Sequence, residues 1–439
     1  MKTKSRKRED IMEVCECGKE HRSSVKEVFV GSGAISRLPE AIAKLGGTKA
    51  FILADENTFG AAGDKVTVAL ESAGIPYSKY VLKNGCMPDE KSIGSSFAHF
   101  DNSCDVIIGV GSGVINDTSK LMSKVSRRPY ISVATAPSMD GYASVTSSMD
   151  IDGLKTSLKT KCAEIIVGDT DVLKNAPMRM LRAGLGDMLA KYVSICEWRI
   201  SHLVTGEYYC EYIASLIRSA LKDCADNADG LINRDEKAVE AVFRGLILAG
   251  QGMEYAENTR VASGMEHSLS HIWDMRDLAF HTKSDLHGIQ CGVATLIAAK
   301  CYEQLVKIKP CREKAMAYAK NFDLDAWNKQ LLDFIGEGAN AMIALDKKER
   351  KYDLAKHEAR LDRIIGGWDE ILKIISEELP SSKRIEEILN TIGAPTSCEQ
   401  IGVDPKTLPM TFRAAKDLRD KYILPRLCWD LGIIDEIKF

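Results

Sequence analysis

Hydrophobic and polar positions follow a strand–helix alternation over about the first 170 residues. Short apolar runs have the length of buried strands, and they occupy residues 28–30, 50–54, 80–82, 106–110, 130–133 and 165–168. Between them the apolar residues recur at helical spacing, over residues 35–45, 65–73, 91–101 and 115–126. This alternation predicts a mostly parallel sheet with helices on both faces. Such sheets bind ligands beyond the carboxyl ends of their strands.

The strand pattern stops near residue 171, and helical periodicity follows. The expected helices span residues 178–200, 208–231, 235–258, 266–273, 291–305, 355–376 and 411–424. We therefore expect an α/β, Rossmann-like N-terminal domain and an all-α C-terminal domain. The expected divisions are a tail and ribbon at 1–25, the nucleotide-binding α/β domain at 26–173 and the helical domain at 174–439. The charge-rich run 346–363 is expected to be a solvated helix or loop.

Composition narrows the class of protein. The formal net charge is −3 and the isoelectric point is about 6.3, so we expect no nucleic-acid partner. No apolar stretch reaches the roughly 18 residues that cross a membrane, and the basic start of the chain lacks the apolar run of a signal peptide. Residues 1–10 are expected to be a solvated tail. The 13 cysteines, an odd number, fit reduced thiols in a cytoplasmic protein.

A glycine-rich turn follows the expected strand 106–110. In Gly111-Ser112-Gly113 the glycines would let the backbone approach a phosphate at the start of the next helix, in which Asn116 and Asp117 follow. The segment lacks the G-x-G-x-x-G spacing, so a tight turn without a ligand is the alternative.

Polar residues follow two further expected strands. Asp55 comes directly after the strand 50–54, where an acidic residue commonly meets an adenosine ribose, and a surface turn is the alternative. The segment 134–144 (ATAPSMDGYAS) brings hydroxyl groups and a carboxylate directly after the strand 130–133. These groups would line a ligand site, although a solvated loop is the favoured interpretation of the segment taken by itself.

Asp152-Gly153 predicts a tight two-residue hairpin. Lys155, Lys159 and Lys161 follow closely and would be able to hold a phosphate. A charged hairpin face is the simpler interpretation.

Four of the eight histidines fall within 21 residues, namely His267, His271, His281 and His287. His267 and His271 stand at i, i+4 and would share one face of a helix. Neutral imidazole is the commonest metal ligand, so the segment is a candidate metal site. Ordinary polar residues on a helix and its following loop are the alternative.

Asp187 lies among small and apolar residues, between Gly186 and Met188. An unpaired carboxylate there would be costly, so it either pairs with Lys191 at i, i+4 or binds a metal ion. Gly184 and Gly186 would let another chain or a ligand come close to the carboxylate.

A second candidate cluster lies near the N-terminus. Cys15, Cys17 and His21 would supply three ligands of a small metal site. No second cysteine pair follows at zinc-finger spacing, so a surface ribbon is the favoured interpretation.

Five segments occur in an order that resembles a known superfamily: GVGSG…ND at 109–117, TAPSMDG at 135–141, AGLGD at 183–187, EHSLSH at 266–271 and LHGIQCG at 286–292. The chain resembles the iron-type alcohol dehydrogenases, glycerol dehydrogenases and dehydroquinate synthases. Within them it most resembles the bacterial sn-glycerol-1-phosphate dehydrogenases of the arabinose-operon type. The likeness runs from about Cys15 to Gly432.

The resemblance implies that one divalent metal ion is bound by Asp187, His267 and His287. It implies that His271 faces the substrate, although its spacing from His267 alone would suggest a shared ion. The interval between His267 and His287 is longer than in some relatives, so residues 274–285 are expected to be an inserted loop. His281, within it, is a weak alternative ligand.

The resemblance also implies a cofactor site. The pyrophosphate would be held by Gly111, Ser112, Gly113, Asn116 and Asp117. Further cofactor contacts would come from Thr135, Ser138 and Ser144. Asp55 would meet the adenosine ribose and Asp140 the substrate. The chain departs from the pattern at Met139, where archaeal relatives often have histidine.

The implied reaction is the NAD(P)H-dependent and metal-dependent reduction of dihydroxyacetone phosphate to sn-glycerol 1-phosphate, a step of phospholipid metabolism. Asp187, His271 and Asp140 would be the catalytic residues, and nickel, zinc or iron the metal. The partner is a small phosphorylated ketone or polyol, and a cytoplasmic homodimer is expected. The alternatives are a dehydrogenase of unphosphorylated polyols, a dehydroquinate-synthase-like lyase and a nucleotide-binding protein without turnover.

Overall fold

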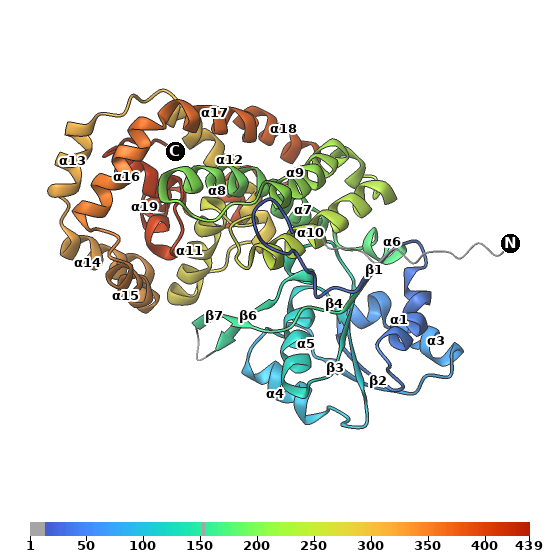
Figure 1. The fold of residues 1–439 in the computed structure, drawn as a ribbon. Coiled ribbons are helices and arrows are strands. Elements are labelled where there is room, and N and C mark those ends of the chain that lie inside the picture. Colours follow the sequence, from blue (N-terminus) through green and yellow to red (C-terminus); the bar gives the residue numbers. More distant parts are fainter. Residues whose placement is uncertain (1–13, 152–153) are drawn as a thin grey trace.

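A six-stranded parallel sheet forms the first part of the chain in the computed structural model, which describes residues 14–151 and 154–439. Figure 1 shows this part below the helices that follow it in the chain. Its strands are β1 (Glu27–Gly31), β2 (Ala50–Asp55), β3 (Tyr77–Leu82), β4 (Val106–Gly111), β5 (Tyr130–Ala134) and β8 (Ile165–Asp169). Their order is β1-β8-β5-β4-β2-β3, and every pairing is parallel. All six predicted strands and the predicted parallel sheet are confirmed.

The strand order reverses between β2 and β4. From β2 the chain moves outward to β3, whereas from β4 it moves in the other direction to β5. Because β2 and β4 pair in register, Ala54 opposite Val110, the strands end side by side at Asp55 and Gly111. Ligands of open α/β sheets bind at such a reversal, so the sheet topology places both predicted cofactor segments at the expected edge.

The sheet lies between two apolar layers. Phe51 and Leu53 point into one cluster, and Ile52 and Ala54 point into the other, as alternation along a strand requires. The helices of this part are α1 (Leu38–Lys44), α2 (Glu56–Thr58), α3 (Asp64–Ser72), α4 (Glu90–Ala98), α5 (Gly113–Ser126) and α6 (Thr170–Leu173). The first of the two clusters also contains buried residues of the helical part, so the sheet and the helices share one core.

The predicted hairpin is confirmed. Strands β6 (Thr146–Ile151) and β7 (Leu154–Lys159) pair antiparallel with Ile151 opposite Leu154. Asp152 and Gly153 themselves lie outside the described residues, as does the expected tail at 1–10.

Within the described part of the chain, every regular element after residue 170 is a helix. The longer ones are α7 (Met178–Leu189), α8 (Lys191–Thr205), α9 (Glu211–Asp226), α10 (Glu236–Ala256), α11 (Met265–Phe280), α12 (His287–Leu305), α13 (Arg312–Lys320), α14 (Leu324–Ile335), α15 (Ala339–Glu349), α16 (Leu354–Gly366), α17 (Trp368–Glu378), α18 (Ser382–Thr391), α19 (Leu408–Leu418) and α20 (Leu424–Asp430). No helix within 14–151 and 154–439 is both long and apolar enough to cross a bilayer.

Several sequence expectations for the helices were wrong in detail. Ala190 divides the expected helix 178–200 into α7 and α8, and Gly367 divides the expected helix 355–376 into α16 and α17. The expected inserted loop 274–285 is helical as far as Phe280, because α11 continues. The run 346–363 is not simply solvated, since Asp346 and His357 are buried.

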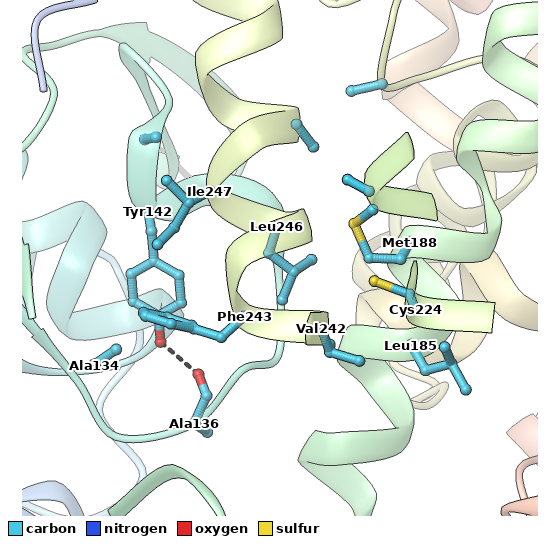
Figure 2. Packing of buried hydrophobic residues seen from close by; sticks show 14 of the residues in the cluster. Ala134, Ala136, Tyr142, Leu185, Met188, Cys224, Val242, Phe243, Leu246 and Ile247 are labelled. Atoms are coloured by element: carbon cyan, nitrogen blue, oxygen red, sulfur yellow. Dashed lines mark hydrogen bonds between the residues drawn. The ribbon is translucent and has the colours of Figure 1, made fainter. Parts of the chain in front are cut away.

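A loop at the carboxyl edge of the sheet packs against the helical part. The short 3-10 helix η3 (Asp140–Ala143) lies in this loop, and its Tyr142 ring meets Phe243 of α10 edge-on, with centroids 5.4 Å apart (Figure 2). The Tyr142 hydroxyl donates a 2.6 Å hydrogen bond to the carbonyl of Ala136. The loop 135–144 is therefore held between the sheet and α10.

Candidate active site

The position of Asp187 follows from close packing around α7. At Gly186 the backbone of α7 meets that of α12, and an added Cβ would lie 2.2 Å from the carbonyl oxygen of Gly288. At Gly184 an added Cβ would lie 1.8 Å from the carbonyl oxygen of Pro137. The two glycines let α12 and the loop 135–144 approach α7, and Asp187 is fully buried where they meet.

Asp187 and Asp140 share a lysine. The Lys191 ammonium donates to Oδ1 of Asp187 at 2.9 Å and to Oδ2 of Asp140 at 2.7 Å. The backbone N–H of Asp140 donates to Oδ2 of Asp187 at 2.9 Å. The sequence offered two partners for Asp187, Lys191 or a metal ion, and the pairing with Lys191 is present. The same carboxylate also faces a histidine.

His267 on α11 faces this carboxylate. Its Nε2 lies 3.5 Å from Oδ1 of Asp187, and its Nδ1 lies 2.9 Å from Oε1 of Glu266. A carboxylate on Nδ1 fixes the ring and leaves Nε2 to bind a ligand, which is the arrangement typical of metal-binding histidines.

His287, at the first position of α12, is held in the same way. Its Nδ1 lies 2.9 Å from the Ser270 hydroxyl, and its Nε2 lies 3.6 Å from the Cys291 sulfur. Its ring centroid is 5.0 Å from that of His267. The ligand atoms of Asp140, Asp187 and His267 lie within 4.8 Å of one another, as do those of His267, His287 and Cys291. His267 therefore joins the two groups.

The charges of the site favour a cation. Burial by itself would raise the pKa of Asp187, but Lys191 and His267 hold it well below its usual range. Burial by itself would lower the pKa of His267, but Cys291 and Asp187 raise it well above its usual range. The negative partners that favour a protonated imidazole would also favour a divalent ion, whose binding releases such protons.

The donor types fit the divalent metal that the resemblance implies, although His267 groups with Asp187 in one set and with His287 in the other. Asp187 offers a carboxylate oxygen, and His267 and His287 each offer Nε2 after Nδ1 has found a partner. One carboxylate and two imidazoles suit zinc, nickel and iron.

His271 lies beside the candidate ligands. Its ring stacks on that of His287 with centroids 5.3 Å apart, and its ligand atom groups with those of Asp274 and His287. His281 is exposed, at the end of α11, and belongs to none of the candidate metal groups of the described residues. His281, the weak alternative ligand, therefore lies apart from the candidate metal site.

The glycine turn meets the start of α5. Gly113 is the first residue of α5, and no side chain caps the helix at Ser112. Asn116 points inward, accepting from Tyr130 and donating to the carbonyl of Gly141 at 3.1 Å each. Asp117 faces the hairpin and accepts from the Ser148 backbone. Asn116 therefore ties α5 to the loop 135–144, and the phosphate contact of the turn stays a prediction.

The other predicted cofactor residues line the same edge. Thr135 donates its backbone N–H to the carbonyl of Gly111, and Ser138 and Ser144 are buried in the same loop. The Ser144 hydroxyl bonds to Thr146. Asp55 caps α2 by accepting from the backbone of Thr58 at 2.9 Å.

The hairpin lysines were candidates for holding a phosphate. Lys159 and Lys161 are exposed, and the side chain of Lys155 lies outside what the structure describes. A charged hairpin face agrees with this.

Sequence reasoning missed several residues of the site. Glu266 adjoins His267 in the chain, and Cys291 follows His287 by one helical turn, so spacing would have been enough to nominate both. Ser270 had no signal, because a single serine three residues after a histidine is common. The contact between Lys191 and Asp140 depends on the tertiary fold.

Known proteins resemble this chain over most of its length. Residues 29–177 match the family described as iron-containing alcohol dehydrogenase. The chain is 30% identical over 410 residues to the NAD(P)+ glycerol-1-phosphate dehydrogenase of Geobacillus stearothermophilus, with 92% of each chain covered. It is 28% identical over 415 residues to the enzyme of the same name from Halalkalibacterium halodurans, with 93% of this chain and 94% of the relative covered.

Solved structures share the fold. A glycerol dehydrogenase from Schizosaccharomyces pombe superimposes with a TM-score of 0.61 at 18% identity, over 94% of this chain and 90% of that one. The parallel sheet with a helical second part is therefore the fold of this group. With nearly complete coverage by relatives of one name, the chain belongs to the family of glycerol-1-phosphate dehydrogenases.

Proposed function

We propose that this chain catalyses the NAD(P)H-dependent reduction of dihydroxyacetone phosphate to sn-glycerol 1-phosphate, and the reverse reaction. One observation supports this most directly. The loop 135–144 bonds to the glycine turn at one end, through Thr135 and Gly111, and to the candidate metal ligands at the other, through Asp140 and Asp187. A nucleotide at the strand edge and a metal ion at Asp187 would thus be neighbours.

The bound groups would supply the hydride, from the nicotinamide, and Lewis acidity at the ketone oxygen, from the metal ion. The residues that would hold the ion are Asp187, His267 and His287. Glu266 and Ser270 orient the two imidazoles. Asp140 would meet the substrate, and the backbone contact to Asp187 fixes its position. The His271 imidazole would deliver the proton that the reduced oxygen needs.

The finer assignments are part of the same proposal. We assign nickel or zinc as the metal, with iron as the third choice, since all three accept imidazole and carboxylate. We further propose a cytoplasmic homodimer with domains at 26–173 and 174–439.

The test begins with chelator-treated protein, to which nickel, zinc or iron is restored separately. NADH absorbance is then followed with dihydroxyacetone phosphate and with dihydroxyacetone. The proposal expects metal-dependent oxidation with the phosphorylated ketone, and sn-glycerol 1-phosphate by chiral analysis. Turnover of dihydroxyacetone alone would indicate a polyol dehydrogenase, and no turnover of either would exclude the substrate.

Variants test the ligand assignment. Asp187→Asn and His267→Ala should each lose metal and at least about a hundredfold in turnover, in line with the several kcal/mol that a Lewis-acid metal supplies. Asp325→Asn changes an exposed carboxylate on α14, away from the site, and serves as the comparison. A variant that lost Asp187 yet kept its metal and its rate would contradict the assignment.

A further inference from the structure

A second cluster of metal-ligand side chains lies outside the candidate active site. Cys15, Cys17 and His21 come from the N-terminal segment, and Cys210 from the residue before α9. Their ligand atoms all lie within 4.8 Å of one another. Cys210 stands 195 residues from Cys15 in the chain, so the fold alone brings the fourth ligand into place.

The segment presents the three ligands on one side. Along residues 14–25 the odd-numbered residues are half-buried or buried and the even-numbered ones are exposed. Cys15, Cys17 and His21 therefore all point inward. Gly18, with φ of +81°, closes a turn in which its N–H donates to the carbonyl of Cys15 at 2.7 Å.

The distances match a tetrahedral ion. Zinc–sulfur bonds of about 2.3 Å and a zinc–nitrogen bond of about 2.0 Å place two sulfurs about 3.8 Å apart, and a sulfur and a nitrogen about 3.5 Å apart. The Cys15 and Cys210 sulfurs are 3.7 Å apart. Nε2 of His21 is 3.4 Å from the sulfurs of Cys17 and of Cys210. A disulfide would need a sulfur separation of about 2.05 Å.

The surroundings hold the ligands in this arrangement. The His21 ring stacks on Tyr212 with centroids 5.7 Å apart and lies 5.6 Å from Tyr255. Its Nδ1 is buried without a hydrogen-bond partner among the described residues, and its Nε2 faces only thiols. The Tyr208 hydroxyl donates to the Cys17 sulfur at 3.2 Å, as an outer-shell partner does to a metal thiolate.

We propose that Cys15, Cys17, His21 and Cys210 bind a structural zinc ion. Three thiolates and one imidazole complete a tetrahedron, and a closed set of four protein ligands leaves no position for substrate. The ion would fasten the N-terminal ribbon to the start of α9. Since this ribbon leads directly into β1, the site would anchor the edge of the sheet to the helical part. The proposal stands apart from the proposed function.

The test measures metal per chain in the full-length protein by mass spectrometry after growth with zinc. Cys17→Ser and Cys210→Ser should each lose one zinc per chain. His21→Cys, which replaces the imidazole with a fourth thiolate, should keep it. Cys311→Ser, at an exposed thiol outside the cluster, is the matched control. His267→Ala should lose only active-site metal, which separates this proposal from the proposed function.

A second readout needs no variant of the cluster. Wild-type protein loaded with cobalt should show the intense visible absorption of a tetrahedral cobalt thiolate. Equal zinc content in Cys17→Ser, Cys210→Ser and the wild type would overturn the proposal. So would the absence of the thiolate band, or a thiol count two below the 13 cysteines in unreduced protein, which would indicate a disulfide.

Discussion

The backbones of α7 and α12 touch at Gly186 and Gly288. A methyl group on Gly186 would overlap the Gly288 carbonyl oxygen, with only 2.2 Å between the atoms. The next residue after Gly186 is Asp187, and the residue before Gly288 is His287, so this contact sets the separation of two proposed metal ligands.

Gly186→Ala should therefore weaken both the fold and the metal site. Backbone atoms on both sides cannot rotate away, so we expect a loss of about 1–3 kcal/mol in the free energy of unfolding. Metal affinity should fall as well, because α12 must move. Thermal unfolding and metal titration measure the two effects. Gly94→Ala, inside α4 with no atom within 4 Å of the added methyl, should be neutral or stabilising by up to about 1 kcal/mol. Equal melting temperatures for the two variants would contradict the packing argument.

Lys191 balances the charge of Asp140 and Asp187 in the same region. Both the ammonium and the Asp187 carboxylate are 0% exposed. Lys191→Met removes the cation and leaves two carboxylates close together, so the metal-free protein should lose about 3–5 kcal/mol of stability. Added nickel or zinc should raise the melting temperature of this variant by more than that of the wild type.

The comparison that isolates this effect is Lys174→Met, because Lys174 forms a partly exposed ion pair with Asp171, with side chains 32% and 36% exposed, and should change little. If the metal-induced shift were the same in Lys191→Met as in the wild type, Lys191 would not share the charge of the metal site.

The sheet was predictable because each strand is a short apolar run between helical patterns, and such local signals survive folding. The end of α11 was not predictable, because tertiary contacts such as that of Arg276 with Phe334 extend the helix over residues 274–280. His281 follows in a left-handed conformation, with φ of 55°, and is carried away from the other histidines. The cluster at Cys17 could not be completed from the sequence, because its fourth member, Cys210, is too far along the chain for any spacing rule to connect them.

Asp55 can be tested as the ribose-binding residue. Asp55→Asn keeps a side chain that caps a helix but loses the charged acceptor for the ribose hydroxyls. The KM for NADH should rise by about tenfold, because the loss of one hydrogen bond worth about 1.4 kcal/mol changes an equilibrium constant tenfold. The preference should move toward NADPH, because the carboxylate no longer repels the 2′-phosphate.

Thr58→Ala is the control for Asp55. It removes the hydroxyl that accepts from the Asp55 backbone at 3.0 Å, and so disturbs the cap without changing the charge. Steady-state kinetics with both cofactors distinguish the two effects. An unchanged ratio of NADPH to NADH efficiency in Asp55→Asn would exclude Asp55 from the ribose site.

Asp346 should make stability depend on pH. Burial raises the pKa of this carboxyl to about 7, and the negative charge of Asp417 adds to the rise, while Lys351 opposes it. In the unfolded chain the pKa of Asp is about 3.9. Between about pH 4 and pH 7 the unfolded chain therefore gives up a proton that the folded chain keeps, so the free energy of unfolding falls as the pH rises. Below about pH 4 the carboxyl is protonated in both the folded and the unfolded chain, so Asp346 adds no pH dependence there.

The side chain of Asp346→Asn is neutral at every pH, so its burial does not lower the free energy of unfolding as the pH rises. Relative to the wild type, its free energy of unfolding should be higher at pH 8 than at pH 5, by on the order of 2–4 kcal/mol. Urea unfolding at the two pH values measures the difference, and Asp325→Asn, at an exposed position on α14, should show none. Because the mutation also removes the 3.0 Å contact with Lys351, the sign of the change between the two pH values is decisive and not the value at either one. A difference that is the same at pH 5 and pH 8 would mean that Asp346 is ionised in the folded protein throughout.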